Sequence, residues 1–288
     1  MPKEITVGLD GSPESLSAAR WAAREAQLRG LPLRLLHLWI LPPMTAQRIR
    51  REDEQAVAAE RLLQDAEAGL RAQYPDVLIT TQLLPADTPA ALLPAAPDAE
   101  LLVLGSQGLG TVRGYLLGSL GLHTVAQSDR PVVLVRAYEQ PIGTKSPAAR
   151  SGAVAVGVSL RQGYDGALEF AFDAANRRAV PLLAVHAAGH RPSVITREHP
   201  PGTTAQEADR QALAEALLPW RESYPDVHVV EHVSPDGPAR AVVDIAIGAG
   251  LLVVGRGGYR TGPAPRIGPV AHAAIHHAAC PVAVIPHD

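Results

Sequence analysis

Residues 101–119 have the sequence LLVLGSQGLGTVRGYLLGS, and residues 251–269 repeat its pattern as LLVVGRGGYRTGPAPRIGP. Each stretch begins with a short apolar run that predicts a buried parallel strand, and glycines follow it at once. Glycines after a strand let the backbone approach a ligand closely, and a helix that begins next offers free N–H groups to an anion. A strand, a glycine loop and a helix in this order therefore predict a phosphate-binding site, here written twice.

The two copies differ where the pattern ends. The first copy ends in Gly118 and Ser119, whereas the second ends in Gly268 and Pro269. Serine adds a hydroxyl donor at this point, and proline removes both the hydroxyl and the backbone N–H. The sequence therefore predicts two nucleotide-binding modules, of which only the first keeps its polar groups.

The repeat runs through the whole chain, which indicates a duplicated domain. Val7-Gly8-Leu9-Asp10 corresponds to Val156-Gly157-Val158-Ser159 at an offset of 149 residues. Three more segments recur at offsets of 149 or 150: PLRLLH at 32–37 and PLLAVH at 181–186, YPDV at 74–77 and 224–227, and PVVLV at 131–135 with PVAVI at 281–285. The polar segment between the copies contains two prolines and predicts a linker. We therefore expect two domains, 1–137 and 152–288, joined by a linker at 138–151.

The composition fits two domains and argues against several other classes of protein. The chain has 288 residues, of which 47% are apolar, so it can fill two cores. A net charge of −3 gives no reason to expect nucleic acid as a partner. The one cysteine, Cys280, excludes a disulfide framework within the chain and fits a reducing compartment. Because no apolar run approaches the ~20 residues of a membrane helix and no signal-peptide pattern is present, we expect a cytoplasmic protein without a membrane partner.

Hydrophobic periodicity predicts the same alternation of strands and helices in both halves. In the first half, the strands are expected at 5–9, 33–39, 77–84, 101–104 and 131–135, and the helices at 13–29, 52–73, 88–95 and 119–128. Such alternation implies a parallel sheet with helices on both faces, in which ligands bind beyond the carboxyl ends of the strands. We therefore expect Asp10, Leu38 and Gly105 at one rim of the sheet.

Taken together, these motifs resemble the universal stress protein family. The resemblance is carried by the spacing G-x2-G-x9-G-[ST], the segment VGLDGS at 7–12, the strand that ends in His37, and the closing PVVLV at 131–135. It covers nearly the whole chain, as a tandem pair. It implies an α/β fold in which each domain has an open five-stranded parallel sheet of order 3-2-1-4-5. In one subgroup of the family it also implies bound ATP, with or without Mg²⁺.

The resemblance assigns the nucleotide contacts to the first domain. Gly8 and Asp10 would line the ribose and phosphate side, and Leu38 would meet adenine. The ribose and phosphates would be held by Leu104, Gly105, Gly108, Gly118, Ser119 and Leu120. In the second domain, Gly157, Gly255, Gly258 and Gly268 match the pattern, whereas Ser159 and Pro269 depart from it.

Several of these residues also have an interpretation that needs no ligand. Asp10 could cap the helix that follows, although Ser12 occupies the better capping position. Gly105 and Gly108 could be turn glycines only, and Arg113 could be a solvated loop arginine instead of a phosphate contact. For Asp10, Gly105 and Gly108 we favour the interpretation as ligand contacts. For Arg113 the sequence favours neither interpretation.

The histidines of the chain have structural interpretations. His37 and His186 end equivalent strands, and we expect them to pack or to form hydrogen bonds. A zinc site is suggested by His272, His276, His277 and Cys280. Structural zinc sites need four ligands at constrained spacing, and the sequence offers no second cluster, so we expect helix surface and no metal there.

Other nucleotide chemistries lack their motifs. No lysine precedes Thr111 as in a Walker loop, no G-x-G-x-x-G follows the first strand, and no G-x-S-x-G nucleophile elbow is present. With no catalytic residues to assign, we favour an ATP-binding sensor or regulator of a stress response over an enzyme. Two alternatives stay open: a slow ATPase or adenine-nucleotide hydrolase, in which Asp10 and Mg²⁺ position a water, and an interaction scaffold that binds no nucleotide.

The last strand of each half has a further implication. Val132–Val135 and Val282–Ile285 each close a sheet, and an exposed apolar edge strand is a pairing hazard unless it is covered. The resemblance suggests that these strands pair with each other across a pseudo-two-fold axis, as in a family homodimer. A homodimer of the whole chain would then contain four modules.

Overall fold

The computed structural model describes residues 3–40, 48–86, 91–106, 115–137, 152–160, 165–187, 205–257 and 267–286. It divides the chain into two compact units, Met1–Glu139 and Gln140–Asp288. The linker predicted at 138–151 lies outside the described residues.

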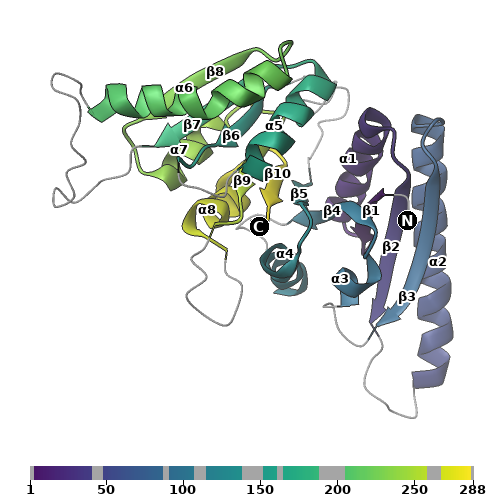
Figure 1. The fold of residues 1–288 in the computed structure, drawn as a ribbon. Helices are drawn as coiled ribbons and strands as arrows, with labels where there is room; N and C mark the ends of the chain where they lie inside the picture. The colour runs from purple at the N-terminus through teal and green to yellow at the C-terminus, as the bar shows by residue number, and fades with distance from the viewer. Residues whose placement is uncertain are drawn as a thin grey trace. The chain divides into compact units, whose positions relative to one another are not determined.

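The first unit contains a parallel sheet in the order β3-β2-β1-β4-β5 (Figure 1). Its strands are β1 (Glu4–Leu9), β2 (Leu33–Ile40), β3 (Ile79–Ala86), β4 (Ala99–Ser106) and β5 (Val132–Arg136). Its helices are α1 (Pro13–Arg29), α2 (Arg48–Gln73), α3 (Leu92–Ala95) and α4 (Tyr115–Gln127). The predicted α/β class and the order 3-2-1-4-5 are confirmed.

The second unit repeats this topology in the order β8-β7-β6-β9-β10. Its strands are β6 (Val154–Gly157), β7 (Leu182–Ala187), β8 (Val229–Ser234), β9 (Leu251–Gly255) and β10 (Val282–Ile285). Its helices are α5 (Asp165–Arg178), α6 (Ala205–Ser223), α7 (Pro238–Ile245) and α8 (Pro269–His277). In the described part of the chain, no helix combines the length and apolar character that crossing a bilayer needs.

Several predicted boundaries in the first unit are wrong. α2 begins at Arg48 and not at Glu52, and β4 spans Ala99–Ser106 and not 101–104. α4 begins at Tyr115 and not at Ser119, because the residues before Gly118 are themselves compatible with a helix. β3 begins at Ile79 and not at Val77, since the Val77 N–H donates to the Tyr74 carbonyl and keeps this residue in a turn. The predicted start of α3 at Thr88 lies outside the described residues, and the helix is observed from Leu92.

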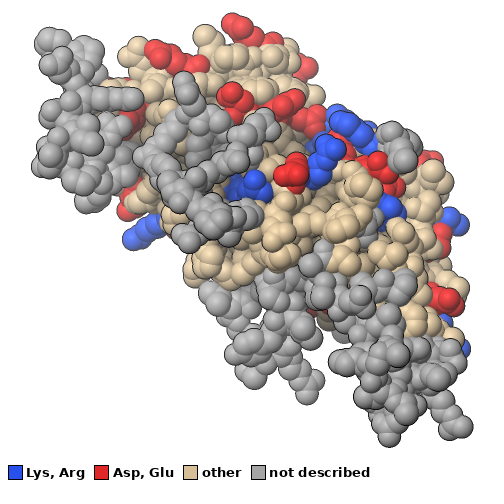
Figure 2. Space-filling view, turned by 60° about the horizontal axis from the view of Figure 1, so that its bottom comes forward, with Lys and Arg blue, Asp and Glu red and all other residues tan. Residues whose placement is uncertain are grey.

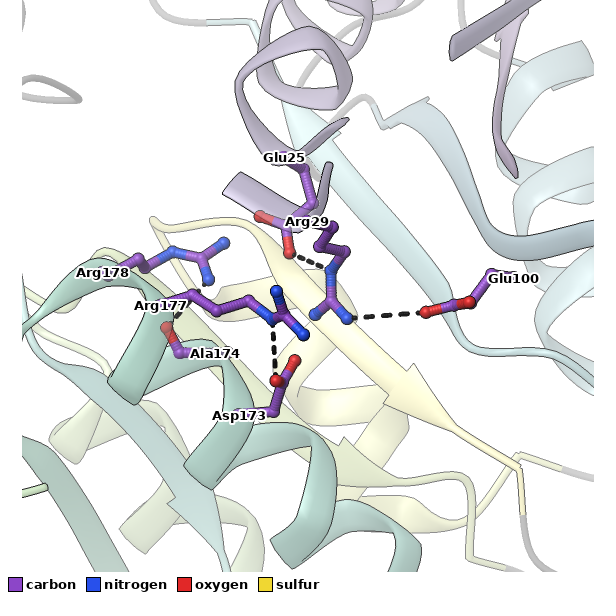
Figure 3. Close-up of polar contacts among 7 residues, drawn as sticks. All are labelled: Glu25, Arg29, Glu100, Asp173, Ala174, Arg177 and Arg178. Carbon is purple, nitrogen blue, oxygen red and sulfur yellow. Dashed lines mark hydrogen bonds and ion pairs between the residues drawn. The ribbon is translucent and has the colours of Figure 1, made fainter. Parts of the chain in front are cut away.

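Ion pairs lie at the end of the first sheet that is opposite the predicted ligand rim (Figure 3). Glu25, which is 1% exposed, accepts a hydrogen bond from Arg29 Nε at 2.6 Å, and Arg29 Nη1 lies 3.8 Å from Glu100. These contacts join the last turn of α1 to the start of β4. In the second unit, Arg177 pairs with Asp173 along α5.

The first helix of each unit ends in the same backbone motif. After α1, the N–H of Leu31 donates to Ala26 O at 3.0 Å and Gly30 has φ +64°; after α5, the N–H of Val180 donates to Ala175 O at 3.2 Å and Ala179 has φ +50°. Glycine adopts this left-handed conformation readily, whereas alanine is strained in it. The second unit therefore carries strain at a position where the first does not.

We expect Ala179→Gly to stabilise the second unit by about 0.5–1 kcal/mol and Gly30→Ala to destabilise the first by about 1–2 kcal/mol. A Cβ at Gly30 meets nothing within 4 Å, so the effect there comes from the backbone alone. Differential scanning calorimetry of both variants measures the shifts. Transitions that move in the same direction would contradict this assignment.

Candidate functional site

The carboxyl ends of β1, β2 and β4 meet at one rim of the first sheet. Leu9 is in register with His37, and Val7 is in register with Val103. Asp10 follows Leu9 and Leu38 follows His37, and both lie at the rim. The chain leaves β1 toward β2 on one side, while β4 lies on its other side, so strand order reverses here. Ligands of open α/β sheets bind at such a switch point.

Gly105 lies inside β4 and is needed there for packing. A Cβ on Gly105 would lie 2.6 Å from both the carbonyl carbon of Glu14 and the amide nitrogen of Ser15, at the start of α1. Such distances do not occur in real structures, so only glycine lets α1 approach the sheet this closely. The interpretation of Gly105 as a turn glycine is therefore wrong.

Gly8 has a packing role on the other face of the sheet. A Cβ on Gly8 would lie 2.8 Å from Leu104 Cδ2 and 4.0 Å from Leu92 Cδ1. Leu104 is buried, so its backbone is the part that a ligand at the rim can reach. In the second unit, a Cβ on Gly157 would lie 2.7 Å from Val242 Cγ1. At both glycines the nearest atom belongs to a side chain, so a Cβ there would require that side chain to shift and not the backbone.

Asp10 is exposed at the rim and is not the helix cap. Ser12 caps α1, because its Oγ accepts a hydrogen bond from the Ser15 N–H at 3.1 Å. Asp10 Oδ1 accepts hydrogen bonds from the Ser12 N–H at 3.0 Å and from Ser12 Oγ at 2.6 Å. Among the described residues, Asp10 Oδ2 has no protein partner and is available to a ligand.

The structure describes the other predicted site residues to different extents. Leu38 is half-buried in β2, in register with Leu84 of β3. Gly118, Ser119 and Leu120 lie inside the first half of α4. Gly108 and Arg113 lie outside the described residues. The structure therefore brings Gly8, Asp10, Leu38, Leu104 and Gly105 together and leaves the loop contacts as predictions.

The glycine loop of the second unit is closed at its base. Gly268 is the N-cap of α8, and its own N–H donates to the Arg256 carbonyl at 2.9 Å. Gly257 has φ +57°, and a Cβ on Gly268 would lie 3.0 Å from its carbonyl carbon. Pro269 has no N–H, and the Gly268 N–H already donates to a carbonyl. Neither residue can therefore donate a backbone hydrogen bond to an anion at the start of α8.

The histidines of β2 and β7 form the same hydrogen bond in both units. His37 lies within β2, which continues to Ile40, so the expectation that it ends the strand is wrong. His37 Nδ1 lies 2.7 Å from Leu9 O, and His186 Nδ1 lies 3.0 Å from Val158 O. A carbonyl oxygen only accepts, so Nδ1 carries the proton in each ring. The hypothesis that these residues form hydrogen bonds is confirmed.

Other side chains singled out in the sequence form no complete metal site in the described part of the chain. The rings of His272 and His276 lie 4.3 Å apart along α8, and Cys280 is buried. The described residues include no group of three or more histidine, cysteine or carboxylate side chains placed to hold a metal ion. The absence of a metal stays a prediction.

The described part of one molecular face carries both signs of charge. Figure 2 shows Lys and Arg side chains interspersed with Asp and Glu side chains on this face. A polyanion would therefore meet no continuous basic surface among these residues.

One functional candidate escaped the sequence analysis. Ser15 is 1% exposed, and its hydroxyl is hydrogen-bonded to the β1–α1 turn that carries Asp10. The sequence contained one signal for it, since Ser15 stands three residues after the capping Ser12, where a helix has unsatisfied N–H groups.

The universal stress protein family model matches residues 1–136 and 152–286, and the chain belongs to this family as two tandem copies. Universal stress protein Rv2623 of Mycobacterium tuberculosis (strain H37Rv) is 35% identical over 274 residues, which cover 88% of each chain. Universal stress protein Rv2005c of the same strain is 34% identical over 296 residues, covering 97% of this chain and 96% of the relative.

A solved structure agrees on the fold. The crystal structure of a universal stress protein from Archaeoglobus fulgidus covers 98% of both chains with a TM-score of 0.71, at 18% sequence identity. At this identity the likeness shows the fold alone.

We expect Gly105→Ala to destabilise the first unit by about 1–3 kcal/mol even without a ligand, because the added methyl group displaces the first turn of α1. Gly69→Ala is the matched control: Gly69 is exposed in α2, and a Cβ there meets nothing within 4 Å, so helix propensity predicts a gain of up to about 1 kcal/mol. Chemical denaturation followed by circular dichroism measures both changes. Equal stability of Gly105→Ala and the parent would show that the packing role is wrong.

Proposed function

We propose that this protein binds an adenine nucleotide, ATP in the first place, in its first unit and acts as a sensor or regulator of a stress response. The observation that supports this most is the exposed Asp10 carboxylate at the switch point between β1 and β4, beside Gly105. Membership of the universal stress protein family supports the stress-related role. A cytoplasmic location fits the single buried cysteine, Cys280.

The chemistry of the rim suggests how each part of the nucleotide is held. An ionised carboxylate only accepts hydrogen bonds, so Asp10 suits the ribose hydroxyl groups and not the phosphates. The half-buried Leu38 offers an apolar surface to adenine, and Gly8, Leu104 and Gly105 offer close backbone approach. The phosphates would be bound by Gly108, Gly118, Ser119 and Leu120.

Mg²⁺ fits the same arrangement. Hard cations take oxygen ligands such as carboxylates and phosphates, and the exposed Asp10 supplies one at the rim. When bound with ATP, the ion would neutralise phosphate charge. The residues of the chain would still provide adenine and ribose recognition.

We propose that the second unit binds nucleotide weakly or not at all. Ser159 stands in place of Asp10, Pro269 lacks both the hydroxyl of Ser119 and an N–H, and the Gly268 N–H already donates to the Arg256 carbonyl. The role of this unit is then structural.

Two other functions remain as alternatives, and the nucleotide released from denatured, freshly purified protein separates them. A slow ATPase or adenine-nucleotide hydrolase, in which Asp10 and Mg²⁺ position a water, would release ADP or AMP. An interaction scaffold would release nothing. The sensor would release ATP, which we expect because the sequence contains none of the nucleotide-hydrolysing motifs tested above.

We expect Ser119→Ala to weaken ATP binding by about 10-fold or more, because a hydrogen bond to a charged group is lost. Isothermal titration calorimetry measures the affinity and, in the parent, a stoichiometry of one ATP per chain. Ser223→Ala is the control, since this exposed α6 hydroxyl donates to the Pro219 carbonyl in its own helix and is remote in sequence from the proposed site. Unchanged affinity in Ser119→Ala, or two equal sites per chain, would contradict the proposed site.

We also propose that the last strands of the two units pair with each other. β5 and β10 each end the strand order of their own unit, and all their residues except the half-buried Arg136 are buried and apolar. The Leu102 N–H donates to Pro131 O and the Leu252 N–H donates to Pro281 O. In β5 and β10, the backbone N–H and C=O groups of odd-numbered residues therefore point toward the neighbouring strand of the same unit. The backbone N–H and C=O groups that point away from the unit's own sheet belong to the even-numbered residues of β5 and β10. A homodimer of the whole chain would add further copies of the same module.

If these strands pair, the amide protons of Val132, Leu134, Val282 and Val284 should exchange with solvent as slowly as those of Val133 and Ala283, which face inward. Hydrogen exchange followed by NMR measures each amide without any substitution. Fast exchange confined to the even positions would exclude the pairing.

A further inference from the structure

The β1–α1 turn of the first unit is held by a closed set of hydrogen bonds among three residues. Ser15 Oγ accepts from the Asp10 N–H at 3.3 Å and donates to the Ser12 carbonyl at 3.0 Å. The Ser15 N–H donates to Ser12 Oγ, which in turn donates to Asp10 Oδ1. A fifth bond joins the Ser12 N–H to the same carboxylate oxygen. The main chain and the carboxylate of Asp10 are thus both tied to this set.

Ser15 is the buried member of the set. It is 1% exposed, whereas Asp10 is exposed. Its backbone nitrogen is one of the two atoms that a Cβ on Gly105 would touch at 2.6 Å. Ser15 therefore lies between the turn that presents Asp10 and the strand that carries the glycine of the rim. Its position is determined by packing, and this makes it a rigid support for the turn.

We propose that Ser15 is a positioning residue for the nucleotide, which acts by holding Asp10 in the orientation that accepts hydrogen bonds from the ribose. This inference rests on the proposed nucleotide site and deepens it. Without the Ser15 hydroxyl, the Asp10 N–H and the Ser12 carbonyl lose a partner, and the turn can reorient.

The second unit supports this inference by comparison. After α5 the Val180 N–H donates to Ala175 O, as the Leu31 N–H donates to Ala26 O after α1, and both pairs of residues are offset by 149. At this offset the sequence has Ser159, Arg161 and Tyr164 in place of Asp10, Ser12 and Ser15. All three members of the set are replaced together in the unit whose site is proposed to be degenerate.

If Ser15 only stabilised the first turn of α1, its role would be purely structural. Ser17, in the same helix, provides a matched control for this alternative. Ser17 Oγ donates to the Pro13 carbonyl at 2.8 Å in the same helix, and it forms no bond to Asp10 or Ser12. Ser15→Ala and Ser17→Ala therefore each remove one hydroxyl from the start of α1, but only the first loosens Asp10.

The test compares ATP with 2′,3′-dideoxy-ATP, which lacks both ribose hydroxyl groups, by calorimetric titration of the full chain. We expect the parent to prefer ATP, and Ser15→Ala to weaken ATP binding about 3- to 10-fold while it leaves the dideoxy affinity unchanged. Asp10→Ala should remove the same preference, and Ser17→Ala should change neither affinity. Thermal unfolding of each variant checks that the fold is retained.

The outcomes separate this inference from the proposed function. A parent that binds neither nucleotide contradicts the proposed function, and the role of Ser15 fails with it. A parent that prefers ATP, with Ser15→Ala unchanged or weakened equally for both ligands, overturns the role of Ser15 alone. A parent that binds both ligands equally shows that Asp10 does not contact the ribose, which overturns this inference but leaves nucleotide binding in place.

Discussion

The first turn of α1 lies directly against Gly105, and the arrangement of the first unit depends on this contact. With backbone atoms of Glu14 and Ser15 2.6 Å from where a Cβ would be, no other residue allows the helix to lie so close to β4. Close approach brings the β1–α1 turn next to the carboxyl end of β4. The switch point of the sheet thus becomes a compact rim that presents the exposed carboxylate of Asp10.

Comparison of the two units distinguishes the hydrogen bonds that maintain the fold from the polar residues that line the rim. Both units keep the histidine bond to the end of their first strand, and in both an arginine donates to the first residue of the outer strand: Arg71 to Ile79 O and Arg221 to Val229 O. The polar residues of the first rim, Asp10, Ser12 and Ser15, are in contrast replaced in the second unit by Ser159, Arg161 and Tyr164. A protein that had kept one site and reduced the other to a structural partner would show this division.

Local signals explain which parts of the fold were predictable. α1 was predicted at its observed bounds, because Ser12, Pro13 and Gly30 determine both ends through contacts within one turn. The start of α4 was missed, since a glycine within a helix weakens the local signal that marks its first residue. β3 begins later than predicted because a turn bond to Tyr74 holds Val77 outside the strand.

The sequence by itself determined the duplicated α/β fold and the positions of Asp10, Leu38 and Gly105 at one rim, because periodicity, caps and the repeat are local or self-similar signals. The strand order came from the resemblance to the universal stress protein family and not from these signals. Only the tertiary structure decided why Gly105 must be glycine, that Ser15 is buried beneath Asp10, and that Gly268 uses its own N–H. Each of these depends on how closely two segments pack. Gly105 and Ser15 are 90 residues apart in the chain, and no local pattern encodes a distance across that separation.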